Sequence, residues 1–225
     1  MTGESREDAA ARLAAIKDRI ARAARDAERK ADEVSLIAVS KTYERPQIEL
    51  LIEAGHRLFG ENRVQEAQSK WPALREAYPD ASLHLVGQLQ SNKAADAVAL
   101  FDAIHSLDRP SLLTALARAM DKSGRRPACF LQVNIGEEAQ KGGCAIAEVP
   151  GLVAEARAAD LPLAGLMCVP PADVEAAPYF ALLAKIARDN GLAGLSMGMS
   201  GDFETAVMLG ATHVRIGTAL FGARQ

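Results

Sequence analysis

A lysine closes an apolar run near the start of the chain and is the first residue whose position indicates chemistry. In LIAVSKTY, residues 36–43, the segment from Leu36 to Val39 is typical of a buried strand, and Lys41 follows it. An amine at the edge of a pocket can bind a phosphate as a point charge, or it can form a Schiff base with a carbonyl carbon. A strand can also end on a lysine because the chain has reached solvent, so three interpretations of Lys41 stay open.

Two glycine-containing segments near the end of the sequence are typical of anion sites. GMSGD at residues 198–202 offers the hydroxyl of Ser200 and the first N–H groups of a predicted helix, which favour an anion. RIGT at residues 215–218 adds Gly217, where a ligand can approach the backbone closely, and the hydroxyl of Thr218. Turn glycines and a helix cap would explain either segment alone. Both segments, however, follow the last two predicted strands, where (β/α)8 barrels often bind phosphate.

Arg215 is a third candidate, because its neighbours Val214 and Ile216 are apolar. A cation inside an apolar strand is costly unless it has a partner. That partner is either an acid such as Asp202 or Glu204, in a structural ion pair, or a ligand atom that faces a fixed positive charge. The residues alone leave both interpretations open.

Short apolar runs alternate with segments of helical spacing, and these elements position the candidate residues. The apolar runs lie near 34–40, 57–59, 82–86, 102–106, 128–135, 161–168, 192–196 and 212–216. The helical segments lie near 46–55, 62–77, 91–99, 109–123, 145–159, 173–190 and 202–210. Eight strands separated by seven helices predict an α/β fold, a single (β/α)8 TIM barrel. A doubly wound open sheet is the alternative, but no G-x-G-x-x-G follows the first strand.

The predicted barrel gathers the candidates at one end, because (β/α)8 barrels build their sites at the carboxyl ends of the strands. Lys41 ends the first predicted strand. FGENRVQE at residues 59–66 places Asn62 at the end of the second strand. The two glycine-containing segments follow the seventh and eighth strands, so all the candidates are expected around one barrel mouth.

Residues 5–31 predict a long N-terminal helix with apolar side chains on one stripe and charges on the other. Ser5 with Asp8 resembles a capping box at its start. We expect this helix to serve as the eighth outer helix or to cap one end of the barrel. The predicted organisation is one structural domain, with an extra N-terminal helix at 1–33 packed on a barrel at 34–225.

Composition narrows the classes of partner. The net charge of the 225 residues is −3, which gives no electrostatic argument for nucleic acid. No apolar stretch approaches the roughly 20 residues that span a bilayer, and the polar N-terminus lacks the apolar core of a signal peptide. The three cysteines are odd in number, and none of the four histidines has metal-ligand spacing. We therefore expect a cytoplasmic protein with reduced thiols and without a metal, membrane or nucleic-acid partner.

Seven segments together resemble one known family. They are LIAVSKTY, GHRLFGENRVQEA, HLVGQLQSNK, IHSLD, LAGLMCVPP, LSMGMSGDFETAV and VRIGTALFGAR, and the match runs from about residue 34 to 223. In order and spacing they are similar to the pyridoxal phosphate homeostasis protein family. That family binds pyridoxal 5′-phosphate (PLP) in a single barrel like the N-terminal domain of alanine racemase.

The resemblance implies a role for each candidate residue. Lys41 is expected to carry PLP as an internal aldimine, and Arg215 is expected to face its pyridine nitrogen. Asn62 is expected to lie near the cofactor ring. A set of small residues, Ser200, Gly217 and Thr218, is expected to hold the phosphate together with backbone N–H groups. The resemblance implies no catalytic residue.

The same resemblance implies cofactor storage rather than catalysis. A permanent cation beside the pyridine nitrogen discourages its protonation and weakens the ring as an electron sink. The sequence stops at Gln225, so we expect no second β domain carrying the acid/base group that racemases of this fold use. Tyr43 could reach the barrel mouth, although an ordinary position on the rim is favoured.

We therefore expect a monomeric PLP carrier or buffer that limits the free aldehyde and releases cofactor to apo-enzymes through transient contacts. A PLP-dependent amino-acid racemase of low activity is the first alternative. The second is a phosphosugar aldolase or isomerase that uses Lys41 on a substrate carbonyl. The carrier and the racemase predict a bound chromophore, whereas the aldolase predicts none.

Overall fold

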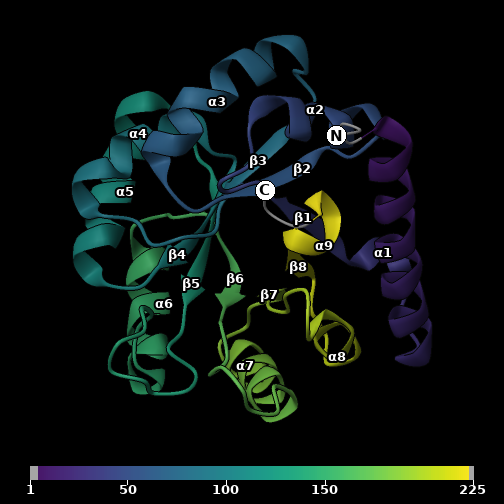
Figure 1. Ribbon diagram of the computed structural model, residues 1–225. Coiled ribbons are helices and arrows are strands. Elements are labelled where there is room, and N and C mark those ends of the chain that lie inside the picture. Colours follow the sequence, from purple (N-terminus) through teal and green to yellow (C-terminus); the bar gives the residue numbers. More distant parts are fainter. Residues whose placement is uncertain (1–4, 223–225) are drawn as a thin grey trace.

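Eight parallel strands close into a barrel in the computed structural model, which describes residues 5–222 (Figure 1). The strands are β1 Ser35–Val39, β2 Leu58–Glu61, β3 Ser82–Leu85, β4 Ala103–Leu107, β5 Ala128–Gln132, β6 Leu163–Met167, β7 Gly194–Ser196 and β8 His213–Ile216. Each strand pairs with the next one along the chain, and β8 pairs with β1. This closure confirms the predicted (β/α)8 barrel and excludes the open sheet. The ends of the two predicted segments, residues 1–4 and 223–225, lie outside the described residues.

Helices surround the strands on the outside of the barrel (Figure 1). They are α1 Arg6–Asp26, α2 Arg45–Glu53, α3 Val64–Ala77, α4 Ala94–Leu100, α5 Pro110–Ser123, α6 Val149–Ala158, α7 Ala177–Asp189, α8 Phe203–Met208 and α9 Thr218–Phe221, with short 3-10 turns at Ala31–Glu33, Ser91–Lys93 and Ile146–Glu148. Prolines in the first turns of α2, α5, α6 and α7 favour these starting points, because the missing N–H has no intrahelical partner there. No helix within residues 5–222 has both the length and the apolar character needed to cross a membrane.

Helix α1 takes the position of the eighth outer helix, one of the two places predicted for it. It packs against α2, α8 and α9 (Figure 1). Arg19 donates two hydrogen bonds to the carboxylate of Glu204 in α8, at 2.9 and 2.7 Å. The predicted capping box of Ser5 and Asp8 is confirmed at its start. The helix ends at Asp26, before the predicted residue 31, because the chain turns there, with residue 28 at a positive φ of 56°.

Several strands end earlier than the apolar runs predict. β1 ends at Val39, so Lys41 lies two residues beyond it, in the turn that leads to α2. β5 ends at Gln132 because the chain then folds back, and the N–H of Asn134 bonds to the carbonyl of Cys144 at 2.9 Å. Helix α9 was not predicted, since four residues are too few for a periodic pattern.

The barrel interior differs from the layer between strands and helices. The outer layer is apolar, with large side chains such as Trp71 and Phe59 fully buried. Inside the barrel, by contrast, the polar side chains of His84, His105 and Arg215 are buried. The ring of His105 stacks on Phe130 and lies within hydrogen-bonding distance of His84, and Arg215 lies near enough to influence it. Buried polar groups need hydrogen-bond partners, so the interior must supply them.

Candidate functional site

One cavity at the carboxyl ends of the strands brings the predicted site residues together. Its volume is about 380 Å³, which lies in the range of small-molecule sites. All six predicted residues line it, together with four apolar ones: Lys41, Asn62, Ser200, Arg215, Gly217 and Thr218, with Val39, Val86, Val169 and Met199. A larger cavity of about 550 Å³ lies near the amino ends of β1 and β2, under α1, and contains none of the six.

Lys41 is half-buried at the edge of this cavity. Its amine makes no hydrogen bond or ion pair with any residue in the described part of the chain. The cavity that it lines also contains the buried Arg215 and small residues that carry hydroxyl and N–H groups. The structure therefore favours the two ligand interpretations of Lys41, a phosphate contact or a reactive amine. The other groups that line the cavity distinguish between these two.

The segments that follow β7 and β8 offer donors suited to an anion. The hydroxyls of Ser200 and Thr218, and the N–H groups of Ser200, Gly217 and Thr218, have no partner among residues 5–222. The start of α8 contributes less than predicted, because the N–H groups of Asp202 and Phe203 both bond to the carbonyl of Met199. The loop before α8, rather than the helix start itself, therefore carries the free donors on this side.

Arg215 extends from β8 and is almost fully buried, with 5% of its surface exposed. Its guanidinium donates to Ser196 Oγ at 2.7 Å and to the carbonyl of Cys168 at 2.8 Å. The structural ion pair considered for it does not form. Glu204 binds Arg19 instead, and the carboxylate of Asp202 accepts from the N–H of Met199. Arg215 is therefore a fixed cation at the cavity, balanced by no carboxylate in the described part of the chain.

A hydrogen-bonded chain supports Arg215 from inside the barrel, and the sequence did not indicate it. His105 Nδ1 lies 2.8 Å from Ser196 Oγ, and His105 Nε2 lies 3.0 Å from His84 Nδ1. Because an arginine can only donate, Ser196 Oγ accepts from Arg215. Its O–H proton can then point to His105 Nδ1, and in that tautomer His105 Nε2–H donates to His84 Nδ1. Both imidazoles are neutral in this arrangement.

Apart from Lys41 and Arg215, the residues that line the cavity carry no ionisable side chain. Tyr43, considered as a second acid/base, is buried away from the cavity. Its phenol donates to the carbonyl of Gly222 at 3.1 Å, and its ring stacks on Phe221 at 4.4 Å between centroids. Residues 5–222 contain no group of three or more His, Cys, Asp or Glu side chains placed to hold a metal ion.

Asn62 is held beside this site by a close approach of two rim segments. A Cβ added at Gly87, which follows β3, would lie 2.2 Å from the backbone oxygen of Asn62. Only glycine allows this spacing. The HLVGQLQSNK segment therefore makes room for Asn62, and its polar side chains do not line the cavity that contains Lys41.

The fold and this site define the class of protein. The family described as alanine racemase, N-terminal domain, matches residues 12–225. The chain therefore belongs to the class of barrels that this domain represents. Within the class, two bacterial relatives are similar over almost their whole length.

The pyridoxal phosphate homeostasis protein of Escherichia coli K12 is 38% identical over 97% of this chain and 97% of its own. The protein of the same name from Pseudomonas aeruginosa PAO1 is 40% identical, over 95% of this chain and 94% of its own. The solved structure of PipY from Synechococcus elongatus with PLP bound superposes with a TM-score of 0.84 at 37% identity, covering 95% of this chain and 100% of that one. The chain belongs to the pyridoxal phosphate homeostasis protein family, as its sequence motifs predicted.

Proposed function

We propose that this chain binds PLP in the cavity at the barrel mouth and serves PLP homeostasis as a carrier or buffer. The observation that carries the proposal is the set of groups around one cavity. A free amine, a buried arginine and unpaired hydroxyl and N–H donors line it together. The PLP bound by the Synechococcus relative supports the same assignment.

Each lining group has a matching part of the cofactor. When bound, PLP supplies an aldehyde, a phosphate and a pyridine ring. Lys41 offers its amine for a Schiff base, a condensation that releases one water. Ser200, Gly217 and Thr218 offer hydroxyl and N–H donors to the phosphate. In this arrangement Arg215 would face the ring nitrogen, and Asn62 would lie beside the ring.

The surroundings of Lys41 favour storage over amino-acid chemistry. Racemisation requires a second acid/base on the face of the substrate opposite the lysine. The described lining offers none, since Tyr43 is engaged with Gly222 and the remaining lining residues are apolar or neutral. Arg215 further discourages protonation of the ring nitrogen. We therefore propose that the protein is not an enzyme, and a racemase of low activity is the alternative that the test must address.

A spectrum of the purified protein mixed with PLP tests this function. We expect a Schiff-base band near the visible edge that sodium borohydride removes as it reduces the imine to a stable amine. Prolonged incubation with L-alanine, followed by chiral analysis, separates the carrier from the racemase. A protein that gives no band and does not retain PLP would contradict the proposed function. Formation of D-alanine above the rate of free PLP would contradict the non-enzyme assignment.

Arg215→Glu should change the spectrum of the bound cofactor more than it changes cofactor retention. A carboxylate in place of the guanidinium favours a protonated ring nitrogen, which shifts the absorbance of a pyridinium Schiff base. The phosphate donors of Ser200, Gly217 and Thr218 stay in place, so we expect retention to fall by about tenfold or less. Arg215→Lys, which keeps the charge, is the matched control. An unchanged spectrum in folded Arg215→Glu would exclude the ring contact.

The cellular setting of this function also stays a prediction. We propose that the protein acts as a monomer in the cytoplasm and passes PLP to apo-enzymes through transient contacts. Light scattering of the purified protein at several concentrations tests the monomer. Transfer to an apo-enzyme separated by a dialysis membrane, compared with transfer in one compartment, tests whether contact is needed.

A further inference from the structure

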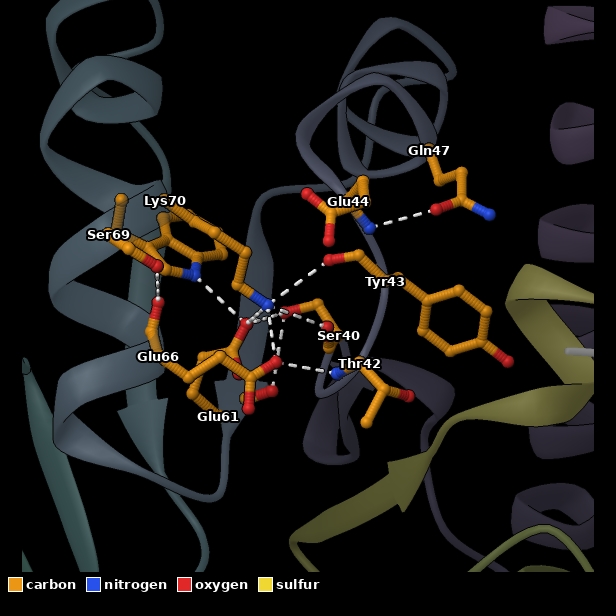
Figure 2. A network of polar contacts seen from close by, with 11 residues as sticks. Ser40, Thr42, Tyr43, Glu44, Gln47, Glu61, Glu66, Ser69 and Lys70 are labelled. Carbon is orange, nitrogen blue, oxygen red and sulfur yellow. Dashed lines mark hydrogen bonds and ion pairs between the residues drawn. The ribbon is translucent and has the colours of Figure 1, made fainter. Parts of the chain in front are cut away.

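The turn that carries Lys41 is held from outside the barrel by a buried ammonium group. Lys70 of α3 donates to the carbonyl of Ser40 at 3.1 Å and to the carbonyl of Tyr43 at 3.2 Å (Figure 2). These two carbonyls stand on either side of Lys41 and the residue after it. Lys70 is 8% exposed, so its side chain is buried for its whole length. Its ammonium therefore clamps both ends of the turn.

The residue at the centre of this turn is strained. Thr42 has a φ of 66°, in the left-handed region, which a β-branched residue adopts only when its surroundings impose it. Its N–H donates to Glu66 Oε1 at 2.6 Å, and the same oxygen lies 2.9 Å from Lys70 Nζ (Figure 2). Glu66 and Lys70 together thus supply the contacts that offset the strain.

A second carboxylate completes the cluster. Glu61 at the end of β2 is fully buried, and its Oε1 lies 2.8 Å from Lys70 Nζ. The same oxygen accepts from Ser40 Oγ at 2.7 Å and from Trp71 Nε1 at 3.2 Å. A buried pair of this kind is costly to desolvate, and it is stable only when further hydrogen bonds satisfy its members. Here several of those further bonds end on the turn that carries Lys41.

The simpler interpretation is an ion pair that only fastens α3 to the barrel. Apolar contacts already do this, because Ala67, Trp71 and Leu74 of α3 are fully buried. An ion pair that only attached α3 to the barrel would also need no hydrogen bond to the loop after β1. Instead, Lys70 donates to two carbonyl oxygens of that loop, and Glu66 accepts from the N–H of Thr42, the strained residue within it. The contacts of the cluster therefore include the turn as well as the interface between α3 and β2.

We propose that Lys70 is a positioning residue for Lys41, acting with Glu66 and Glu61 to hold residues 40–43 in the conformation that presents the Lys41 amine to the cavity. The consequence for cofactor binding rests on the proposed function, whereas the restraint on the turn does not. Reaction of a held amine is sensitive to small displacements, so loss of the clamp affects the covalent step first. The contacts offered by Ser200, Arg215 and the Gly217–Thr218 segment depend on β7 and β8 and should be spared.

Lys70→Met tests the proposal, because methionine keeps most of the length and removes the donors. We expect Schiff-base formation with PLP, followed by absorbance, to slow by about tenfold or more. Binding of pyridoxine 5′-phosphate, which has no aldehyde, should change by less than about threefold. Lys93→Met is the matched control, since among residues 5–222 the Lys93 amine pairs only with Asp96 on the rim, and this variant should behave as the unaltered protein.

A rescue distinguishes positioning from general support of the fold. Asparagine tolerates positive φ far better than threonine, so Thr42→Asn lowers the strain that the clamp offsets. In the Lys70→Met background this second substitution should restore part of the lost rate. Glu66→Gln, which keeps an oxygen for the Thr42 N–H, should be milder than Glu66→Ala. These variants decide the question if Lys70→Met alone does not fold.

Hydrogen exchange of the Thr42 N–H provides a readout without any cofactor. Lys70→Met should accelerate this exchange while core amides of β1 keep their protection. Unchanged exchange and unchanged Schiff-base formation in the folded variant would overturn the proposal. Equal losses of PLP and pyridoxine 5′-phosphate binding would do so as well. Absence of a Schiff base in the unaltered protein would instead overturn the proposed function, and the exchange measurement would still test the clamp.

Discussion

Replacing Lys41 with alanine should abolish the Schiff-base band and leave PLP held only by its phosphate and ring contacts. The amine has no partner in the described part of the chain, so its removal leaves no buried charge uncompensated and should not unfold the protein. Holding amine and aldehyde together makes an otherwise weak condensation favourable, and we expect retention to weaken by about 100-fold. Absorbance and equilibrium dialysis with PLP measure the two effects.

The control is Lys93→Ala, which removes another lysine from the same rim. Lys93 pairs with Asp96 at 3.3 Å and does not line the cavity of Lys41. Removal of the Lys93 side chain should leave the Schiff-base band and the retention of PLP unchanged. Mass spectrometry after borohydride reduction should place the added pyridoxyl group on the peptide that contains Lys41. A band of full intensity in Lys41→Ala, or reduction at another lysine, would refute the assignment.

Acid should destabilise this protein above the pH at which its carboxylates titrate. Burial lowers the pKa of His84 from 6.5 to about 4, and it lowers the pKa of His105 well below the ordinary value. Burial also lowers the pKa of His213 to about 4. The unfolded chain therefore binds more protons than the folded one between pH 6.5 and 4. Stability should be constant above about pH 7 and fall as the pH drops through this window.

The expected loss of unfolding free energy on acidification is large for a single domain. At pH 5, the shift of His84 alone corresponds to about 2 kcal/mol of lost unfolding free energy. His105 contributes in the same direction, and the half-buried His213 contributes less. Urea unfolding at pH 7.5 and pH 5 measures the loss. His84→Gln, which keeps a hydrogen-bonding group without a proton equilibrium, should reduce it by the same amount. Equal stability at the two pH values would show that the three imidazoles are not held neutral.

The barrel could be predicted because the patterns that specify its strands and helices are local in the sequence. Parallel strands buried on both faces appear as short apolar runs, and each is followed by a helix that often starts on a proline. Lys41 and Arg215 were predicted from the same kind of pattern, since Lys41 follows an apolar run and Arg215 lies within one, where a charge is costly. The rule that sites lie at the carboxyl ends of strands then brought them to one mouth.

The contacts that support these residues could not be predicted in the same way. Ser196 and His105 are separated by 91 residues and meet only because the barrel closes. In strands that are otherwise apolar, two histidines gave no sign of which residues they would bond. Lys70 occupies an ordinary position in the helical pattern of α3, and nothing local shows that its acceptors lie in the loop after β1. Positive φ at Thr42 is likewise imposed from outside, against the preference of threonine.

The closure of β8 on β1 has a consequence for when this protein becomes competent during synthesis. Lys41 leaves the ribosome early, whereas Arg215, Gly217 and Thr218 belong to the last strand and helix of the described chain. With the proposed roles, a nascent chain would carry the Lys41 amine long before it has the donors proposed for the phosphate. A ligand that needs both halves binds only the closed barrel and, by mass action, stabilises that closure. Cofactor binding would then distinguish molecules in which β8 has paired with β1 from molecules in which the barrel is still open.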